Sequence, residues 1–295
     1  MKTLSFYLVL LSLTVIGCQK DIDEPSALSA KNDKNCNCNK ARYLPIKVEE
    51  RGIVYTFNYL NDEGDLSEIK KDGPNFNDGT KWKFNYKNGF ISEIIQSYDD
   101  SNSGPDKITV QYTNSNLLTE VDFLSLHCYE DPYWPSDDPH TVCEYESSLK
   151  YQFIWGNGKL KTYKRGSDLF NITYENNLLT SIERYPKINY YGDTRRLYYL
   201  TDKNYWAKDI KNKELLFTLS LGILPIEKDL TKIIASFVKQ DGSIIEEPAV
   251  FVSKYNNDGY PVEIKVSATI FNIDDNTTNT NTYTRKITYK KIILK

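Results

Sequence analysis

The sequence ITYENNLLTSIERY at residues 172–185 carries the pattern from which the fold can be predicted. A run of strand-forming residues ends at the aromatic Tyr174, and Asn176-Asn177 follows. Asparagine tolerates the left-handed backbone region better than most residues, so this pair predicts a tight turn. A second run begins with an apolar residue and carries another one three positions on. The segment is therefore predicted to form a β-hairpin.

The same pattern occurs at five other places in the chain. Asn88-Gly89 suits a two-residue type I′ turn, and residues 61–64 suit a type I turn closed by a glycine bulge. The chain is also rich in Tyr, Phe, Ile, Val and Thr, which favour strands. We therefore predict an all-β fold, an antiparallel meander of repeated hairpins curled into a barrel-like or half-barrel sheet. The other copies are YLNDEGDLSEI at 59–69, YKNGFISEI at 86–94, YTNSNLLTEV at 112–121, WGNGKLKTY at 155–163 and YNNDGYPVEI at 255–264.

The spacing of the apolar residues in the second strand leaves two alternatives. Leu179 and Ile182 lie three positions apart, so they would point to opposite faces of an unbroken strand. Either both faces of the sheet are covered, or a β-bulge shifts the register.

Two segments interrupt the repeats. Residues 124–150 contain three prolines and three aspartates among several aromatics, which predicts an extended loop inserted in the meander. In residues 200–240, the apolar spacing becomes closer to helical, which predicts a short helical insertion at about 208–235, packed over an open end or edge of the sheet. A buried strand over 215–221 is the alternative.

The N-terminus has the features of a secretion signal. Lys2 precedes an apolar run, residues 4–16, that is too short to span a bilayer. The run ends in Val-Ile-Gly-Cys, which resembles the lipobox of bacterial lipoproteins. That resemblance implies a signal peptide at 1–17 and an acylated N-terminal Cys18, and two or more acyl chains would attach the protein stably to a lipid bilayer.

The residues after Cys18 are polar, and we expect residues 18–42 to be a flexible tether and 43–295 to form a single β-meander domain. The start of the tether, KDIDE at 20–24, resembles the charged export signal of some Bacteroidetes lipoproteins. The expected location is the outer membrane, exposed at the cell surface or otherwise facing the periplasm.

The hairpin phrases also resemble known families. They are similar to the YD-type repeats of Rhs proteins, and more so to a family of Bacteroidetes lipoproteins of unknown function described as a domain with a porin-like fold. The resemblance covers residues 45–293 and includes LLFTLSLGILPIEKDLTKII at 215–234 and NTYTRKITYKKI at 281–292. It implies a curled antiparallel sheet. It assigns no catalytic residue.

Charge excludes one class of partner. Without Lys2 the chain has 36 basic and 40 acidic residues, and no basic stripe is present. Nucleic acid is therefore not expected as a partner.

The long loop holds the chain's two histidines and two of its cysteines. We predict a disulfide between Cys128 and Cys143, because thiols oxidise outside the cytoplasm and the spacing departs from that of structural zinc sites. Free thiols are one alternative and a site for zinc or another metal that includes His127 and His140 is the other, and no metal or other cofactor is expected. The pairing of Cys36 and Cys38 in the tether stays open.

The aromatics of the same loop are the candidate ligand contacts. Tyr129, Tyr133 and Trp134 lie beside prolines, and rigid aromatics on loops make good binding anchors. We predict a non-enzymatic surface binding or structural module whose ligand is a glycan or another envelope protein, with no catalytic residue. The alternative is a hydrolase acting on glycans, in which loop carboxylates provide the acid and the base.

Overall fold

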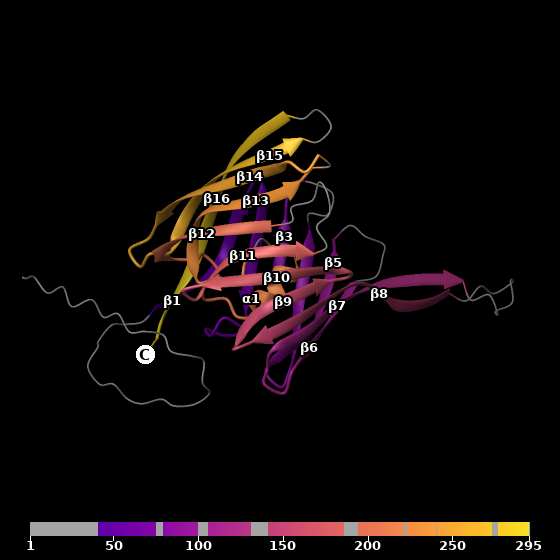
Figure 1. Cartoon of the computed structure of the whole chain (residues 1–295). Coiled ribbons are helices and arrows are strands. Elements are labelled where there is room, and N and C mark those ends of the chain that lie inside the picture. Colours follow the sequence, from indigo (N-terminus) through magenta and orange to yellow (C-terminus); the bar gives the residue numbers. More distant parts are fainter. Residues whose placement is uncertain are drawn as a thin grey trace, which may run out of the picture. The chain divides into compact units, whose positions relative to one another are not determined.

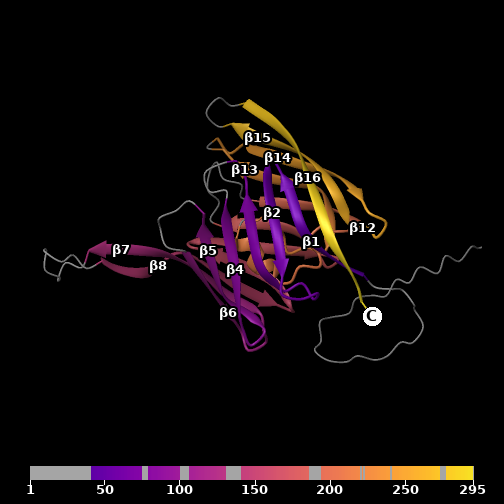
Figure 2. The same cartoon turned by 180° about the vertical axis from the view of Figure 1, so that it is seen from behind.

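The computed structural model describes residues 41–74, 79–99, 106–130, 141–185, 194–219, 221, 223–239, 241–272 and 277–294. These residues form one closed barrel of 16 antiparallel strands in sequence order, and β1 pairs with β16 to close it (Figures 1 and 2). The prediction of an all-β meander is confirmed, and the sheet is a full barrel. No described helix is long and apolar enough to cross a bilayer. The elements are β1 (Ala41–Glu50), β2 (Ile53–Tyr59), β3 (Leu66–Asp72), β4 (Thr80–Lys87), β5 (Phe90–Tyr98), β6 (Asp106–Tyr112), β7 (Leu118–Glu130), β8 (Thr141–Gly156), β9 (Lys159–Arg165), β10 (Asp168–Glu175), β11 (Leu178–Tyr185), β12 (Thr194–Asn204), α1 (Lys213–Thr218), β13 (Lys228–Val238), β14 (Ile244–Tyr255), β15 (Pro261–Asn272) and β16 (Thr277–Ile293).

A β-bulge explains the spacing of the apolar residues in the repeat. In the hairpin of β10 and β11, Tyr174 lies opposite Leu179 and Thr173 lies opposite Ser181, so Thr180 is the extra residue. The bulge turns Leu179 and Ile182 to the same face, and both are buried in the barrel. The same shift occurs directly before the aromatic in all six copies: Tyr59 opposite Leu66, Tyr86 opposite Ile91, Tyr112 opposite Leu118, Trp155 opposite Leu160, Tyr174 opposite Leu179 and Tyr255 opposite Pro261.

Two further copies of the unit complete the ring. Tyr199 lies opposite Leu230 with the same register shift, although a long segment separates the two strands in sequence. Tyr289 on the last strand lies opposite Pro45 on the first, again with a bulge. The barrel is thus eight copies of one hairpin unit, and the chain termini close it by each providing half of the eighth copy.

The repeated aromatics join neighbouring units. Each of five of them, all among the described residues, donates a hydrogen bond to the carbonyl of the first apolar residue of the preceding unit. The pairs are Tyr59 to Pro45, Tyr86 to Leu66, Trp155 to Leu118, Tyr199 to Leu179 and Tyr289 to Pro261. These bonds form part of a ring around one end of the barrel, which we call the turn end because the repeated turns lie there. The opposite end, where β1 ends and β2 begins, is the loop end.

The ring of hydrogen bonds can be tested with two matched tyrosines. Tyr86 donates to the Leu66 carbonyl at 2.9 Å, whereas the buried hydroxyl of Tyr112 has no hydrogen-bond partner within the described residues. Tyr86→Phe is expected to lower the free energy of unfolding by about 1 kcal/mol, because it leaves a carbonyl unsatisfied. Tyr112→Phe is expected to cost nothing. Urea denaturation of both variants checks this, and equal losses would contradict the role given to the bond.

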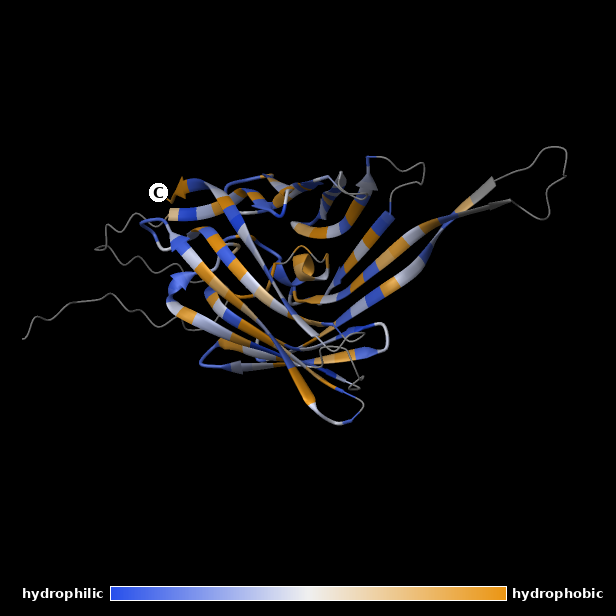
Figure 3. Cartoon of the chain, turned by 90° about the horizontal axis from the view of Figure 1, so that it is seen from above, coloured by the Kyte–Doolittle hydropathy of each residue, from blue (hydrophilic) through white to orange (hydrophobic). Residues whose placement is uncertain are grey.

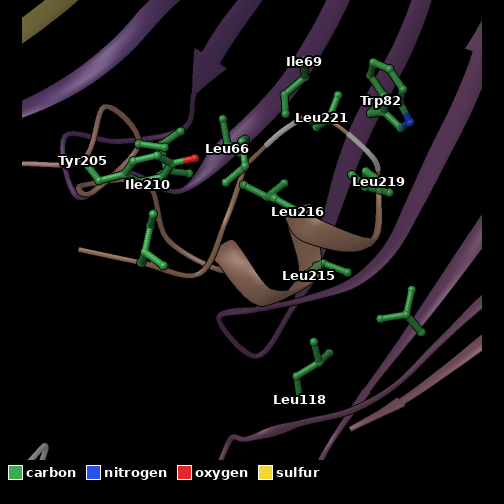
Figure 4. Close-up of a cluster of buried hydrophobic side chains, with 14 of the residues drawn as sticks. Leu66, Ile69, Trp82, Leu118, Tyr205, Ile210, Leu215, Leu216, Leu219 and Leu221 are labelled. Carbon is green, nitrogen blue, oxygen red and sulfur yellow. The ribbon is translucent and has the colours of Figure 1, made fainter. Parts of the chain in front are cut away.

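The segment between β12 and β13 fills part of the barrel. We call residues 205–227 the plug. They replace the turn of the unit formed by β12 and β13, and they enter the lumen from the turn end. Figure 3 shows α1 within the ring of strands, and Figure 4 shows its leucines packed against Leu66 and Leu118 of the wall. The buried apolar side chains among the plug's described residues are Tyr205, Trp206, Ala207, Ile210, Leu215, Leu216, Leu219, Leu221, Ile223 and Ile226.

The prediction for the plug is therefore corrected in two respects. Among the described residues of the predicted insertion only Lys213–Thr218 is helical, and Lys228–Val238, part of which fell in the predicted helical insertion, is strand β13. The segment also packs inside the barrel and not over an end or edge. Such a short helix is marginal by itself, so it depends on burial of Leu215 and Leu216 in the core.

Polar contacts hold the entrance of the plug to the barrel rim. The Asp209 carboxylate accepts hydrogen bonds from the Tyr43 amide and the Tyr260 hydroxyl, both at 2.7 Å. Lys211 donates to Asp65 at 2.8 Å. Gly64, with φ of +92°, passes close to this point: a Cβ there would lie 2.6 Å from the Asp209 carbonyl oxygen. A glycine is required at this position because the plug backbone occupies the space of a side chain.

The predicted loop at 124–150 is mostly strand. Residues 125–130 and 141–148 continue β7 and β8 and pair only with each other, since the contacts with β6 end at Leu124 and those with β9 begin at Tyr151. This two-stranded ribbon projects from the barrel wall (Figures 1 and 2). Residues 131–140, at its tip, lie outside the described residues.

Candidate functional site

The inward face of the barrel changes from apolar to polar toward the loop end. On β3, the buried Leu66 and Ile69 are followed by the inward-facing Lys71. On β5, the next inward positions after the buried isoleucines are Gln96 and Tyr98. A polar-lined space therefore remains in the lumen beyond the tip of the plug.

This space consists of two adjoining hollows in the wall formed by β16 and β1–β5. One, of about 320 Å³, is lined by Lys71, Thr80, Trp82, Gln96 and Tyr98, and the other, of about 140 Å³, by Glu50, Phe57, Trp206 and Arg285. Tyr55 and Leu221 line both, so the hollows share a boundary. We call the two together the lumenal cleft.

A chain of hydrogen bonds orients the side chains of the larger hollow. The indole of Trp82 donates to the Gln96 amide oxygen at 2.7 Å, and the Gln96 amide nitrogen donates to the Tyr98 hydroxyl. That hydroxyl in turn donates to Asp106 at 3.4 Å. Burial raises the pKa of Tyr98, so its hydroxyl stays protonated at neutral pH. The network fixes the Gln96 amide and Tyr98 hydroxyl, a prerequisite for selective binding.

An ion pair lies at the other side of the cleft. Arg285 Nε donates to Glu50 at 2.6 Å, and both side chains are more than four-fifths buried. Burial alone would lower the pKa of Arg285, but the Glu50 carboxylate outweighs it and keeps the guanidinium charged. The guanidinium also lies 5.6 Å from the ring of Trp206. The pair presents a fixed cation and a fixed anion to the lumen.

The chemistry of the lumenal cleft is that of a binding site. It combines fixed donors and acceptors with the aromatic surfaces of Tyr55 and Tyr98 and an apolar floor of Leu219 and Leu221. Lys71 and Arg285 balance Glu50 and the adjacent Asp106 in charge. The cleft therefore suits an uncharged ligand with many hydroxyl groups.

The predicted disulfide falls on the projecting ribbon. The register places Cys128 directly opposite Cys143 on the neighbouring strand, the relative position that a cross-strand disulfide needs. The side chain of Cys128 lies outside the described residues, so the disulfide stays a prediction.

None of the three predicted aromatic anchors has a side chain among the described residues. Tyr129 is a residue of β7 whose side chain is not described, and Tyr133 and Trp134 lie outside the described residues. Their role as ligand contacts stays a prediction.

The alternative zinc site lies only partly within the residues that the structure describes, and the side chain of Cys128 is not among them. His127 is exposed on β7 opposite Glu144, and His140 lies outside the described residues. Across those residues no three His, Cys, Asp or Glu side chains lie close enough to hold a metal ion. The signal peptide, Cys18 and residues 19–40 of the predicted tether, with Cys36 and Cys38, also lie outside them, whereas the last two residues of the predicted tether, Ala41 and Arg42, begin strand β1.

Sequence reasoning did not identify the lumenal cleft, although a signal for it exists. Within β3 and β5, positions of the same parity as the buried Ile69 and Ile94 carry Lys71, Gln96 and Tyr98. Such a switch from apolar to polar residues on one face indicates a wall that leaves the core. Recognising it requires knowledge of the bulge, because the bulge sets which parity faces inward.

Of the comparisons with known proteins, the one with solved structures finds similar chains. A porin-like protein from Bacteroides uniformis is similar with 13% identity and a TM-score of 0.45, over 84% of this chain and 96% of that chain. A porin-like protein from Bacteroides vulgatus is similar with 14% identity and a TM-score of 0.34, over 84% and 99%. The Tc holotoxin pore of Photorhabdus luminescens matches with 12% identity and a TM-score of 0.28, over 75% and 11%. No protein-family model and no curated protein matches the chain.

The resemblance noted in the sequence implied a curled antiparallel sheet, and the described barrel confirms that part. Membership of the lipoprotein family and a relation to YD repeats stay predictions.

Proposed function

We propose that the protein is a lipid-anchored, non-enzymatic binding module of the bacterial envelope that holds a neutral glycan in the lumenal cleft. The observation that carries the proposal is the polar, charge-balanced cleft beyond an apolar plug. Sugars bind through hydroxyl groups, which need fixed donors and acceptors, and through their apolar faces, which pack on aromatic rings. The cleft provides both.

The distribution of polarity supports a binding module over a channel. A membrane-spanning barrel presents apolar residues outward and polar residues to its lumen. Here the buried apolar side chains face inward, while outward positions form ion pairs such as Lys107 with Glu93 and Lys150 with Asp122. The plug also fills the turn end of the lumen with apolar side chains.

The position of Ala41, where the chain enters the barrel, is compatible with a lipid anchor at Cys18. Ala41 begins the barrel opposite Ile293, at the turn end. If residues 19–40 form the predicted flexible tether, a chain of that length would have a root-mean-square length of about 25 Å. Anchoring through Cys18 would therefore favour an orientation in which the turn end lies toward the outer membrane and the loop end away from it, at the cell surface or in the periplasm.

The proposal predicts that glycan binding depends on Lys71, which faces inward on β3, and not on the neighbouring Lys70. Soluble protein that begins after Cys18 would be screened against neutral and uronate-containing oligosaccharides, with affinities measured by isothermal titration calorimetry. Lys71→Ala is expected to weaken binding of a neutral oligosaccharide about tenfold, the effect of losing one hydrogen bond to a charged donor.

Lys70→Ala is the matched control, because Lys70 faces outward, where it pairs with Asp72 at 2.8 Å. Absence of binding to every glycan, or an equal loss in both variants, would refute the assignment of the cleft.

A further inference from the structure

A second cavity lies in the lumen, away from the lumenal cleft. It has a volume of about 250 Å³ and is bounded by β11–β15 and the plug. Its apolar lining consists of Ile182, Leu197, Leu224, Ile233, Ala235, Ala249, Ala268 and Ile270, and its polar lining of Arg195, Glu247 and Thr269. An engineered apolar cavity of about 150 Å³ holds benzene, so this one has room for a ring or a short aliphatic chain.

Three small side chains create the cavity. Ala249 faces Ala268 across the strand pair β14–β15, and Ala235 lies on the same inward face of β13. Elsewhere the inward positions of these strands carry large residues, such as Phe251 and Val266, which fill the core. As a result Ile270, although it faces inward, is 47% exposed. A ligand in this hollow would bury the exposed side chain of Ile270.

One cationic side chain, that of Arg195, lines this cavity. In the strand register, Arg195 and Glu247 lie on either side of Ala235, so their Cα atoms are about 10 Å apart. Glu247 has a structural partner, because it accepts a hydrogen bond from the Phe271 amide at 2.6 Å where the pairing of β14 with β15 has ended. The structure shows no ion pair between Arg195 and Glu247, two described residues. Arg195 is therefore placed to receive an anionic group.

We propose that this cavity binds a short-chain carboxylate, with the apolar part of the ligand among the three alanines and its carboxylate on the Arg195 guanidinium. The guanidinium can donate two parallel hydrogen bonds to a carboxylate. The apolar walls exclude water from the remainder of the ligand, which favours binding by burial of its hydrocarbon surface. The site is separate from the lumenal cleft and does not depend on glycan binding.

Calorimetric titration of the soluble protein with hexanoate, hexanol and hexylamine tests the proposal. Hexanoate is expected to bind, and hexanol to bind about tenfold more weakly because it lacks the charge. Arg195→Gln is expected to weaken hexanoate binding by a similar factor and to leave hexanol unchanged. Ala249→Leu, which fills the cavity, is expected to abolish binding of both.

Arg196→Gln is the matched control for charge, since Arg196 is the next residue on β12 and pairs with Glu246 on the outer surface. Stronger binding of hexylamine, with loss in Glu247→Gln, would overturn the assignment of Arg195 as the binding group. So would hexanoate binding that is unchanged in Arg195→Gln, or no detectable binding of hexanoate at millimolar concentration. Arg195 lines the exposed rim, so its variant remains informative if Ala249→Leu does not fold.

Discussion

Gly64→Ala is expected to lower the free energy of unfolding by about 3 kcal/mol. Part of the loss is conformational, because alanine at φ of +92° costs about 1–2 kcal/mol. The larger part is steric. The new Cβ would lie 2.6 Å from the Asp209 carbonyl oxygen and 3.2 Å from a methyl group of Leu44, and overpacking of this kind costs about 1–3 kcal/mol. Urea denaturation monitored by tryptophan fluorescence measures the loss.

Gly89→Ala separates the two contributions. Gly89 also has a positive φ, +82°, in the turn of the neighbouring unit, but no atom lies within 4 Å of its Cβ position. We expect this control to lose only the conformational part, about 1–2 kcal/mol. If both variants lose the same amount, contact with the plug does not constrain Gly64.

Leu216→Ala is expected to destabilise the barrel by about 2–5 kcal/mol, the range for a buried leucine whose surroundings cannot collapse into the space. Leu216 is fully buried between the plug and the wall. The closed ring of strands restricts movement of the wall, so we expect a value in the upper half of that range. Chemical denaturation measures the difference in stability, and binding of a hydrophobic dye reports whether the lumen has opened.

Leu60→Ala is the control for this variant. Leu60 lies at the turn end next to the plug entrance but is 58% exposed, so its loss should change the stability by less than about 0.5 kcal/mol. A small effect of Leu216→Ala would show that the plug is dispensable for the barrel. In that case the lumenal cleft would have no fixed floor.

The lumenal cleft and the alanine-lined cavity both owe their existence to the plug. In a barrel of this size side chains from the wall alone cannot fill the lumen, since an eight-stranded barrel is already about as wide as its side chains can fill. The plug fills the turn end, and Leu219, Leu221 and Leu224 become walls of the space that remains. The proposed glycan and carboxylate sites are therefore both built partly on one inserted segment.

The sequence determined the hairpin unit. Asn88-Gly89 and Asn176-Asn177 have the positive φ angles expected of their turns, because these residues adopt the left-handed region at little cost. The aromatic residue and the two apolar residues spaced three positions apart predicted a pair of strands. They left open whether a bulge is present or both faces of the sheet are covered. The bulge is present in all six copies. These features are local, so a short stretch of sequence is sufficient to specify them.

Two copies of the unit were missed for a reason that is also physical. The strands of the seventh copy, around Tyr199 and Leu230, are separated by the plug, and those of the eighth, around Tyr289 and Pro45, lie at opposite ends of the chain. Recognition of either copy requires the pairing of residues distant in sequence. The closure of the barrel therefore could not be derived from local patterns.

Only the tertiary structure decided where the plug lies and what it leaves open. Its apolar residues are equally suited to covering an edge of the sheet and to filling the lumen, because the hydrophobic effect is non-directional. Closure of the 16-stranded ring creates a space that must be filled, and this places the plug inside. The lumenal cleft and the alanine-lined cavity then arise where wall and plug do not meet, and no single stretch of sequence contains either of them.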